Sequence, residues 1–236
     1  MMMTFDSPPP IGELNEGSLH AALKKWYARP GDQLEVSLDG YFIDIQRSEL
    51  LIEIQTGNFS QIRTKLQNLV KQHPVRLVYP IAAEKWIVRQ SGSGQSAGQT
   101  RKSPKRGSYF ELFAQLVSFP QLLLDNHFSL EVLLIQEDEI RHHVPGKAWR
   151  RRGWVISDRR LRTVLEKRQF ESPADLRTLF PVEMPETFTT QEIAVAIERP
   201  RRLAQQAAYC LRKLGALDEV GKRGRAIEYR WHLDRD

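Results

Sequence analysis

Two carboxylates lie at spacings that place them together on one side of a predicted β-hairpin. Residues 41–46 and 50–56 alternate apolar and polar side chains and are joined by a short polar turn. In the register that puts the isoleucines of both strands on one face, Asp44 lies directly opposite Glu53, with Cβ atoms about 5 Å apart. Two carboxylates that close repel each other unless a proton or a cation lies between them.

Mg²⁺ suits such a gap, because it takes one or two carboxylates and completes its coordination with water and phosphate oxygens. An ion held in this way can activate water and stabilise the charge that develops on a phosphodiester. The hairpin therefore indicates a metal site with phosphodiester chemistry. An amphipathic hairpin with a merely solvated polar face has the same pattern, and the spacing alone leaves both interpretations open.

The elements that must position this hairpin follow from periodicity and from helix breakers. Leu19, Leu23 and Trp26 share one side of a helix that ends before Pro30. After the hairpin, a helix that ends before Pro74 is expected. The expected elements, in chain order, are a helix up to residue 29, strands over 34–38, 41–46 and 50–56, a helix with Phe59, Ile62, Leu66 and Leu69 on its apolar side, and a strand over 75–79 that 86–88 extends. This α-β-β-β-α-β order predicts an α/β (α+β) fold, a mixed sheet with helices against it.

Asp44 and the later Glu53-Ile54-Gln55, set in this order of elements, resemble the PD-(D/E)XK nuclease superfamily, which includes restriction endonucleases and Holliday-junction resolvases. The resemblance covers about residues 11–90 and implies a restriction-endonuclease-like core. By this resemblance, Asp44 and Glu53 would ligate Mg²⁺ (or Mn²⁺), with the carbonyl of Ile54 nearby, and Gln55 would occupy the position of the family's lysine.

An acid on the first helix often joins the site in such enzymes, and the resemblance makes Glu16 the candidate, with Glu13 behind it. The chain departs from the family pattern where Gln55 replaces the lysine, because an amide carries no charge and does not titrate. Some active members carry Glu-x-Gln. Lys65 or Arg63, on the next helix, could supply the missing charge, and an ordinary solvated helix lysine is the alternative interpretation of Lys65.

Charge is distributed in blocks along the chain. The 236 residues carry a net charge of +6, yet residues 108–140 hold six acids and no Lys or Arg, and residues 141–168 hold ten bases and two acids. Basic blocks favour polyanionic partners, and solvated charged faces are the plain alternative. With 41% hydrophobic residues, the composition excludes a disordered or collagen-like chain, and one cysteine excludes an intrachain disulfide.

The C-terminal residues predict a DNA-binding module. A capping box at Thr189-Thr190-Gln191-Glu192 begins one helix, Pro200 begins a second, and two short strands surround Gly221 to Arg225. Helix, turn, helix and hairpin in about 45 residues resemble a winged helix-turn-helix, in which the second helix enters the major groove and the hairpin contacts phosphate. The expected DNA-binding residues are Arg201, Arg202, Gln205, Gln206 and Tyr209 on the helix and Lys222, Arg223 and Arg225 at the hairpin tip.

The expected domains are a nuclease-like domain over residues 1–140 with a flexible basic loop at 91–107, a basic helical connector over 141–184 with a helix from Ser157 to about Gln169, and a winged helix over 185–236. Two side-chain features and one segment are less specific. Cys210 lies on the apolar side of its helix and is expected in the core. His142 and His143 are adjacent and face opposite ways on a strand.

The segment Arg150 to Arg152, beside Trp149 and Trp154, fits either a grip on a nucleic-acid strand or surface arginines that flank core tryptophans. Taken together, the sequence predicts a Mg²⁺-dependent DNA endonuclease that its winged helix delivers to the substrate. The alternative is a DNA-binding regulatory protein whose nuclease-like fold has lost its chemistry, and an RNA substrate and a homodimer are left open. The short apolar runs indicate no membrane partner, and a reducing, cytoplasmic protein is expected.

Overall fold

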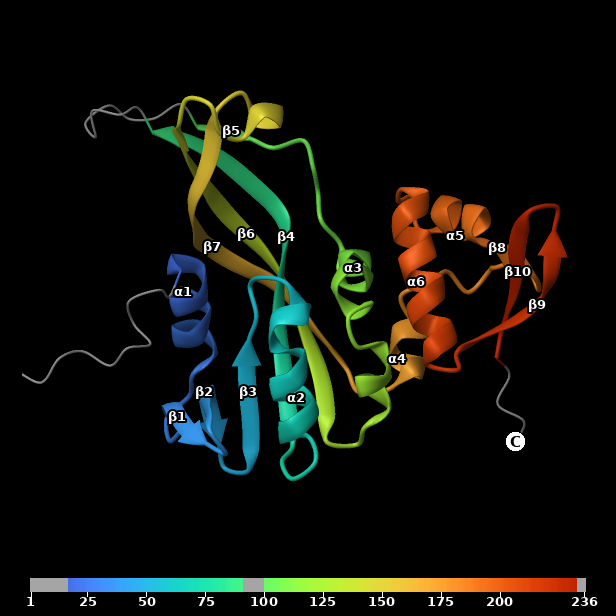
Figure 1. Ribbon diagram of the computed structural model, residues 1–236, viewed down its shortest axis with the longest axis horizontal. Coiled ribbons are helices and arrows are strands. Elements are labelled where there is room, and N and C mark those ends of the chain that lie inside the picture. The colour runs from blue at the N-terminus through green and yellow to red at the C-terminus, as the bar shows by residue number, and fades with distance from the viewer. Residues whose placement is uncertain (1–16, 91–99, 233–236) are drawn as a thin grey trace, which may run out of the picture.

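A single mixed sheet organises most of the protein (Figure 1). The computed structural model describes residues 17–90 and 100–232. The strands, in sheet order, are β1 (Gln33–Leu38), β2 (Tyr41–Arg47), β3 (Leu50–Ile54), β4 (Val75–Gln90), β6 (Phe128–His143) and β7 (Trp154–Phe170), and β5 (Thr100–Lys102) pairs with β4. Neighbouring strands are antiparallel except for β3 with β4 and β4 with β6, which are parallel.

Helices cover both faces of this sheet. One face carries α1 (Ser18–Tyr27). The opposite face carries α2 (Arg63–Leu69), α3 (Phe113–Leu116) and the short 3₁₀ helices η2 (Phe59–Ile62), η3 (Tyr109–Leu112) and η4 (Pro120–Leu124). The order α1-β1-β2-β3-α2-β4 is the predicted one, and the α/β (α+β) class is confirmed.

Residues four apart on α1 form its buried side. Leu19, Leu23 and Tyr27 pack against Ile45 and Ile52 of the sheet, as the 3.6-residue helical period requires. The prediction that Trp26 belongs to this side is wrong, because Trp26 is 46% exposed and Tyr27 takes the core position. Tyr27 therefore continues the four-residue spacing of Leu19 and Leu23 on the buried side.

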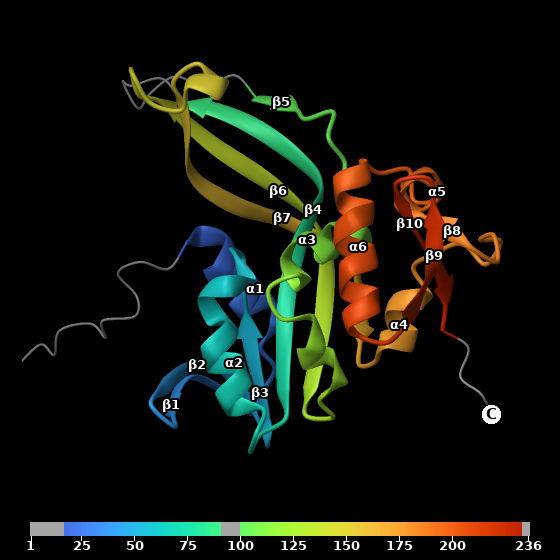
Figure 2. The same cartoon turned by 45° about the vertical axis from the view of Figure 1, so that its right-hand side comes forward.

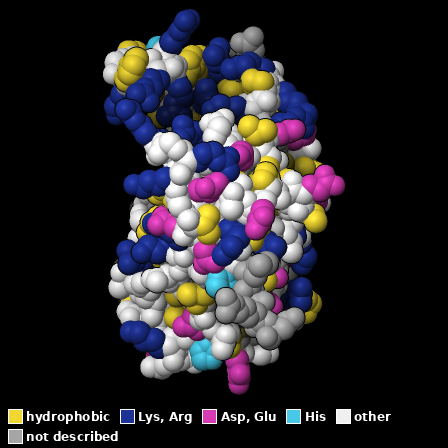
Figure 3. Space-filling model, turned by 90° about the vertical axis from the view of Figure 1, so that its right-hand side faces the viewer, with side chains coloured by type: hydrophobic (Ala, Val, Ile, Leu, Met, Phe, Trp, Pro, Cys, Tyr) yellow, Lys and Arg dark blue, Asp and Glu magenta, His cyan; other side chains and the backbone are white. Residues whose placement is uncertain are grey.

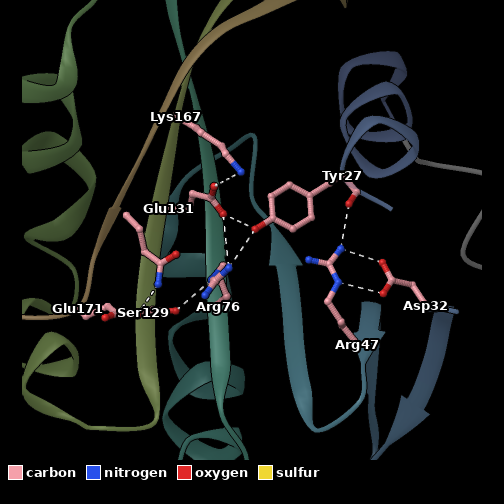
Figure 4. Close-up of polar contacts among 9 residues, drawn as sticks. Tyr27, Asp32, Arg47, Arg76, Ser129, Glu131, Lys167 and Glu171 are labelled. Atoms are coloured by element: carbon pink, nitrogen blue, oxygen red, sulfur yellow. Dashed lines mark hydrogen bonds and ion pairs between the residues drawn. The ribbon is translucent and has the colours of Figure 1, made fainter. Parts of the chain in front are cut away.

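A polar network fixes the end of α1 on the sheet (Figure 4). The Tyr27 hydroxyl donates to the buried carboxylate of Glu131 on β6. Two cations flank that carboxylate, with Lys167 at 3.5 Å and Arg76 at 3.8 Å. Burial raises the pKa of Tyr27, and the neighbouring Glu131 raises it further, so the hydroxyl stays protonated as the donor.

Arg47 joins the same helix end to the β1–β2 hairpin. Its guanidinium binds Asp32 through two hydrogen bonds of 2.9 and 2.8 Å and donates to the Tyr27 carbonyl at 3.0 Å. Bidentate pairing with arginine is strong and directional, and it holds the pKa of Asp32 below its usual value. Together the two networks fix α1, which brings His20 to the candidate site.

The strand β7 replaces the helix predicted from Ser157 to Gln169, which is wrong. β7 pairs with β6 from Leu130↔Phe170 to His143↔Trp154, so the supposed helical connector contributes the edge strand of the sheet. The register shifts at three places along this pair. Bulges of this kind interrupt the two-residue alternation, and the charged edge strand then shows no strand periodicity in its sequence.

The basic loop predicted over 91–107 is only partly described, because residues 91–99 lie outside the described ranges. Its described part contains one short strand. Residues 100–102 form β5 against β4, and the Gly107 amide donates to the Ala82 carbonyl at 3.1 Å. A Cβ on Gly107 would meet that carbonyl oxygen at 2.5 Å, so only glycine fits this close approach.

The C-terminal elements follow the predicted order and add one short strand. They are α4 (Pro173–Arg177), β8 (Phe188–Thr189), α5 (Thr190–Ala196), α6 (Arg201–Lys213), β9 (Leu217–Arg223) and β10 (Ala226–Trp231). The capping box at the start of α5 is present, since the Glu192 carboxylate accepts the Thr189 amide at 2.6 Å. β10 lies between β8 and β9 in a small sheet.

Helix α6 joins this unit to the main sheet, and Figure 2 shows it between α3 and the small sheet. Ala204, Ala207 and Cys210 of α6 are buried, and their cluster is continuous with Phe113 of α3. Cys210 is thus a core residue, as predicted. Within the described residues, no helix has the length and apolarity needed to cross a membrane.

Candidate metal centre and nucleic-acid interface

The candidate centre lies where β2 and β3 separate. Their ladder runs through Arg47↔Leu50 and Gln46↔Leu51 to Ile45↔Ile52, which is the predicted register. Beyond that pair, the two strands are joined through the side chain of Asp44, whose Oδ2 accepts the backbone amide of Ile54 at 2.7 Å. A side-chain acceptor therefore satisfies an amide that a regular ladder would pair with a carbonyl.

The separation of the two strands also redirects Ile43. Four isoleucines were expected on one face, but Ile43 packs in the cluster that contains Leu51 and Leu66, whereas Ile45 and Ile52 pack under α1. Glu35, on the neighbouring strand β1, has a φ of 55°. This left-handed residue departs from extended geometry beside the point where the β2–β3 ladder ends.

Asp44 has two further cationic or donor neighbours. His20 Nε2 of α1 lies 3.2 Å from Asp44 Oδ2, and Lys65 of α2 adds a positive charge nearby. Burial alone would raise the pKa of Asp44, but His20, the Ile54 amide and Lys65 outweigh it, so that this pKa lies below the usual aspartate value. Asp44 is therefore ionised at neutral pH.

Asp44 and Glu53 do not form the directly opposed pair that the sequence predicted, because the β2–β3 ladder ends at Ile45↔Ile52. Asp44 lies against His20 of α1, whereas Glu53 lies against Lys65 of α2. The Glu53 side chain is 7% exposed, and Lys65 Nζ lies 2.5 Å from its Oε1, although the geometry at this buried oxygen is not that of a regular hydrogen bond. Burial raises the pKa of Glu53 to about 7, the Asp44 charge contributes in the same direction, and Lys65 opposes both. The two carboxylates therefore interact, and one of them holds a proton readily near neutral pH.

Lys65 belongs to this centre and is not a solvated helix lysine. Besides the ion pair with Glu53, its ammonium donates to the Phe42 carbonyl of β2. It spans the separated strands from the α2 side, as His20 does from the α1 side. The charge that Gln55 cannot supply is thus present at the carboxylate, delivered from the following helix.

Gln55 does not reach the carboxylates through any contact among the described residues. Its Nε2 donates to the Asn58 carbonyl at 3.0 Å, inside the turn that leads into η2, and its backbone amide donates to Val78 of β4 at 2.9 Å. Glu16 and Glu13, the expected acids of the first helix, lie outside the described residues.

His20 is not among the site residues that the sequence predicted. The helical period supplies a signal for it, because His20 and Lys24 are four residues apart and lie on the same side of α1. Lys24 forms an ion pair with Glu35 of β1, and His20 meets Asp44 of β2. Basic residues at i and i+4 on this helix therefore oppose acids on two adjacent strands.

The donor set fits a hard divalent cation. The two carboxylates come from different strands, and the Asp44 charge acts on Glu53; carboxylate oxygens are the protein ligands that Mg²⁺ and Mn²⁺ prefer. Within residues 17–90 and 100–232, no group of three or more His, Cys, Asp or Glu gathers for metal binding. Asp44 and Glu53 would therefore hold the ion, and Ile54 enters the centre through its amide, which donates to Asp44.

The expected DNA-binding helix, α6, exposes a narrow strip. Arg201, Arg202 and Gln205 are exposed, and Gln206 is half-buried. Tyr209 is 40% exposed and lines a cavity of about 370 Å³ between α6, α2 and η4. Because α6 packs on α3, the expected residues reach solvent mainly in its N-terminal half, and Tyr209 is exposed beyond it.

The hairpin tip divides the three expected cations into two kinds. Lys222 and Arg225 are exposed and form no ion pair within the described part of the chain. Arg223 instead binds Glu192 of α5 at 2.5 Å and also Glu228 of β10. Arg223 therefore ties the hairpin to α5, which limits what it can offer a phosphate.

A family model described as "Domain of unknown function (DUF8091)" matches residues 17–171. The chain belongs to the DUF8091 family. The matched DUF8091 segment begins just before α1 and ends directly after β7, so it contains the whole main sheet and the candidate metal centre. The C-terminal unit follows it.

A protein of Treponema pallidum (strain Nichols), described as an uncharacterized protein, is similar to this DUF8091 chain. The two are 29% identical over 221 residues, which cover 93% of this chain and 87% of the relative. A match of that length extends beyond the DUF8091 segment into the C-terminal unit. No solved structure matches the chain.

Proposed function

We propose that this protein is a metal-dependent nuclease that hydrolyses phosphodiester bonds in DNA, with Mg²⁺ or Mn²⁺ held by Asp44 and Glu53. The observation that carries the proposal is the electrostatic interaction of these two carboxylates at the separated ends of β2 and β3, with the Lys65 ammonium on Glu53. The position of Glu53 at the carboxyl end of β3, within an α-β-β-β-α-β order, supports the resemblance to the PD-(D/E)XK superfamily.

Each residue has a distinct part in the proposed site. Asp44 is ionised and oriented by His20 and the Ile54 amide, so it is ready to bind a cation. Glu53 would hold the cation in its deprotonated form, which a neighbouring positive charge favours. A bound divalent ion supplies positive charge to the phosphate and lowers the pKa of water.

Lys65 is the residue proposed to contact the substrate phosphate. Its ammonium already lies between the Phe42 carbonyl and the Glu53 carboxylate. With Glu53 bound to a cation, the Lys65 ammonium would be free to donate to a phosphate oxygen, where a preorganised donor favours the transition state. Gln55 stabilises the β3–η2 turn in this proposal rather than acting on the substrate.

The C-terminal unit is proposed to deliver the nuclease to DNA as a winged helix. Support comes from its element order, α4-β8-α5-α6-β9-β10, and from the exposed Arg201, Arg202 and Gln205 on α6. Arginine and glutamine side chains match base edges in the major groove, and Lys222 and Arg225 suit phosphate. RNA as the substrate and a homodimer stay open, and a cytoplasmic location is part of the proposal.

The test measures cleavage of supercoiled, linear and branched DNA with Mg²⁺ or Mn²⁺. Asp44→Ala and Glu53→Ala should each remove cleavage. Glu49→Ala is the matched control, because Glu49 is an exposed acid in the turn of the same hairpin and should leave the rate unchanged. Cleavage that persists in the Asp44→Ala/Glu53→Ala double variant would reject the site.

A second candidate function is a non-catalytic DNA-binding regulatory protein on the same fold. Two observations favour it: Gln55 stands where the family has lysine and is bound to the Asn58 carbonyl, and the described residues contain no group of three His, Cys, Asp or Glu arranged to hold a metal. Calorimetry separates the two functions. Mn²⁺ binding that disappears in Asp44→Ala supports the nuclease, and an absence of Mn²⁺ binding in the unaltered protein supports the regulator.

A further inference from the structure

Three strands of the main sheet continue beyond its helix-covered part. β4, β6 and β7 remain paired up to Gln90↔His142 and His143↔Trp154, and Figure 1 shows them rising past the top of α1 and curling over. The short strand β5 pairs with the same part of β4. We call this projection the β-arm and define it as residues 84–90, 100–107 and 137–162.

The β-arm carries a larger positive charge than the net charge of the whole chain. It contains 14 Lys or Arg and five Asp or Glu, a net charge of +9, whereas the whole chain has +6. The space-filling view in Figure 3 shows Lys and Arg side chains gathered at the upper end of the molecule. A surface of this charge density attracts polyanions and releases their counterions on binding.

The acids of the β-arm are already paired with its own cations. Glu84 binds Lys102 at 2.9 Å and also binds Arg106. The remaining four acids pair within the β-arm, namely Glu137 and Glu139 with Lys85, Asp138 with Arg162, and Asp158 with Arg160. The surplus cations therefore have no acid of the β-arm left to neutralise them, and their charge is available to a partner.

An aromatic ring stands at the tip among these cations. Trp149 begins the 3₁₀ helix η5 (Trp149–Arg151) and is 80% exposed, with the Arg150 guanidinium 5.3 Å from its ring centroid. The residues on either side of η5, Ala148 and Arg152, have φ values of 48° and 49°. Left-handed backbone is costly for residues other than glycine, so the tip keeps an unfavourable conformation that projects a tryptophan into solvent.

Cations also lie over the other two tryptophans of the β-arm. Trp86 has Lys102 at 4.9 Å and Arg162 at 3.9 Å from its ring centroid, and Trp154 has Arg89 at 4.8 Å. These cation–π contacts hold the long side chains in place. The guanidinium groups are thereby preorganised along the β-arm, which lowers the entropy cost of binding a ligand.

The β-arm leads to the candidate metal centre. Arg159 Nη2 donates to the Thr56 carbonyl at 2.7 Å, in the segment that directly follows the strand bearing Glu53. Asp158 accepts the Ser18 hydroxyl at 2.7 Å, two residues before His20 on α1. The base of the β-arm therefore touches both elements that flank the centre.

We propose that the β-arm binds single-stranded nucleic acid, with phosphates on its arginines and a base stacked on Trp149. A row of cations with an exposed indole matches a charged backbone that carries planar bases, and stacking requires a base that is not paired in a duplex. The proposed path of the strand from the tip to Asp44 and Glu53 rests on the nuclease proposal. Binding by the β-arm does not.

The test measures anisotropy of a labelled oligo-dT 20-mer with the full chain in EDTA, so that no cleavage occurs. Trp149→Ala should weaken binding by about 5- to 150-fold, the range for loss of one stacked base. The triple variant Arg150→Gln/Arg151→Gln/Arg152→Gln should lower the slope of log K against log salt by about two. Circular dichroism confirms that each variant is folded.

Matched control variants test whether a loss of binding is specific to the β-arm or follows from removing any exposed cations or tryptophan. Lys25→Gln/Arg29→Gln/Lys71→Gln removes three exposed cations elsewhere, and Trp26→Ala removes another exposed tryptophan. Both controls should bind within about twofold of the unaltered protein. Equal weakening by the controls, or full binding by Trp149→Ala, would overturn the proposal.

Two further arms of the experiment identify the ligand. Tighter binding to a 20-bp duplex with no dependence on Trp149 would show that the β-arm holds double-stranded DNA and would overturn the single-strand assignment. Phosphatidylserine vesicles that bind through Arg150–Arg152 while the oligonucleotide does not would overturn nucleic acid altogether. Asp44→Ala should bind the oligonucleotide normally, so failure of the nuclease proposal is distinguishable from failure of this one.

Discussion

The carboxylate of Asp44 accepts the backbone amide of Ile54 at 2.7 Å, at the point where the ladder between β2 and β3 ends. This contact holds two separated strands together through a side chain and fixes the position of the carboxylate. Asp44 therefore has a structural role and a proposed role as a metal ligand, and substitutions can separate the two roles.

Asp44→Asn and Asp44→Ala should differ in stability and agree in metal binding. Asparagine keeps an oxygen for the Ile54 amide, whereas alanine leaves that amide without its acceptor, which typically costs about 1–3 kcal/mol. Neither variant carries the negative charge that Mn²⁺ requires. Urea unfolding and Mn²⁺ calorimetry measure the two effects. Equal stability of both variants would show that the Ile54 contact contributes nothing.

Glu53 should make the stability of the metal-free protein fall as pH rises. Its pKa is about 7 in the folded protein against an ordinary 4.5, so the folded state holds a proton that the unfolded chain has released. The contribution of Glu53 is therefore fully present below pH 4.5 and is lost as the pH rises through 7, at no more than about 1.4 kcal/mol per pH unit.

The measurement compares the unaltered protein with Glu53→Gln by urea unfolding in EDTA between pH 5 and pH 8.5. Glutamine does not titrate, so the free energy of unfolding of the unaltered protein minus that of the variant should decrease across this range. A difference that stays constant or increases with pH would contradict a raised pKa at Glu53.

Lys65 and Gln55 should differ sharply in their importance for cleavage. Lys65→Gln removes the ammonium that lies 2.5 Å from Glu53, and loss of one preorganised donor typically slows a reaction by about 10²–10³-fold. Gln55→Ala removes an amide that binds only the Asn58 carbonyl among its described side-chain contacts, and the rate should change by less than about threefold. If Gln55→Ala slowed cleavage more than Lys65→Gln in single-turnover assays, Gln55 would be the catalytic residue of the two.

Cys210 should not react with thiol reagents in the folded protein. It is fully buried on α6 against α3, with Sγ 4.0 Å from the Phe113 carbonyl, and burial raises the pKa of its thiol to about 12. Because the thiolate is the reactive form, labelling should follow opening of the α6–α3 contact. Rapid labelling by dithionitrobenzoate at neutral pH without denaturant would show that this contact opens easily.

The hairpin-tip cations should separate into a structural and a binding class. Arg223→Gln breaks the ion pairs with Glu192 and Glu228 and should lower the melting temperature. Lys222→Gln/Arg225→Gln should leave the melting temperature unchanged and lower the salt dependence of duplex binding, with a slope change of about two. An unchanged melting temperature for Arg223→Gln would show that these ion pairs do not stabilise the protein.

Local patterns in the sequence predicted much of the scaffold. The spacing of Leu19 and Leu23 indicated α1, and the alternation around Asp44 and Glu53 gave the β2–β3 register that the structure has. Capping residues such as Thr189 marked the start of α5. These features depend on side chains within a few residues of one another, and the physical forces that set them act over the same short range.

Contacts between distant segments decided the rest. The charged segment of β7 forms a strand because its backbone pairs with β6. Bulges in this pairing interrupt the two-residue alternation, so the sequence does not show the strand. Lys65 and His20 reached the carboxylates because α2 and α1 pack on opposite faces of the sheet. By itself the sequence determined which residues could do chemistry and on which strands they lie. Only the tertiary structure decided which cations meet them, because that depends on how helices pack rather than on how residues are spaced.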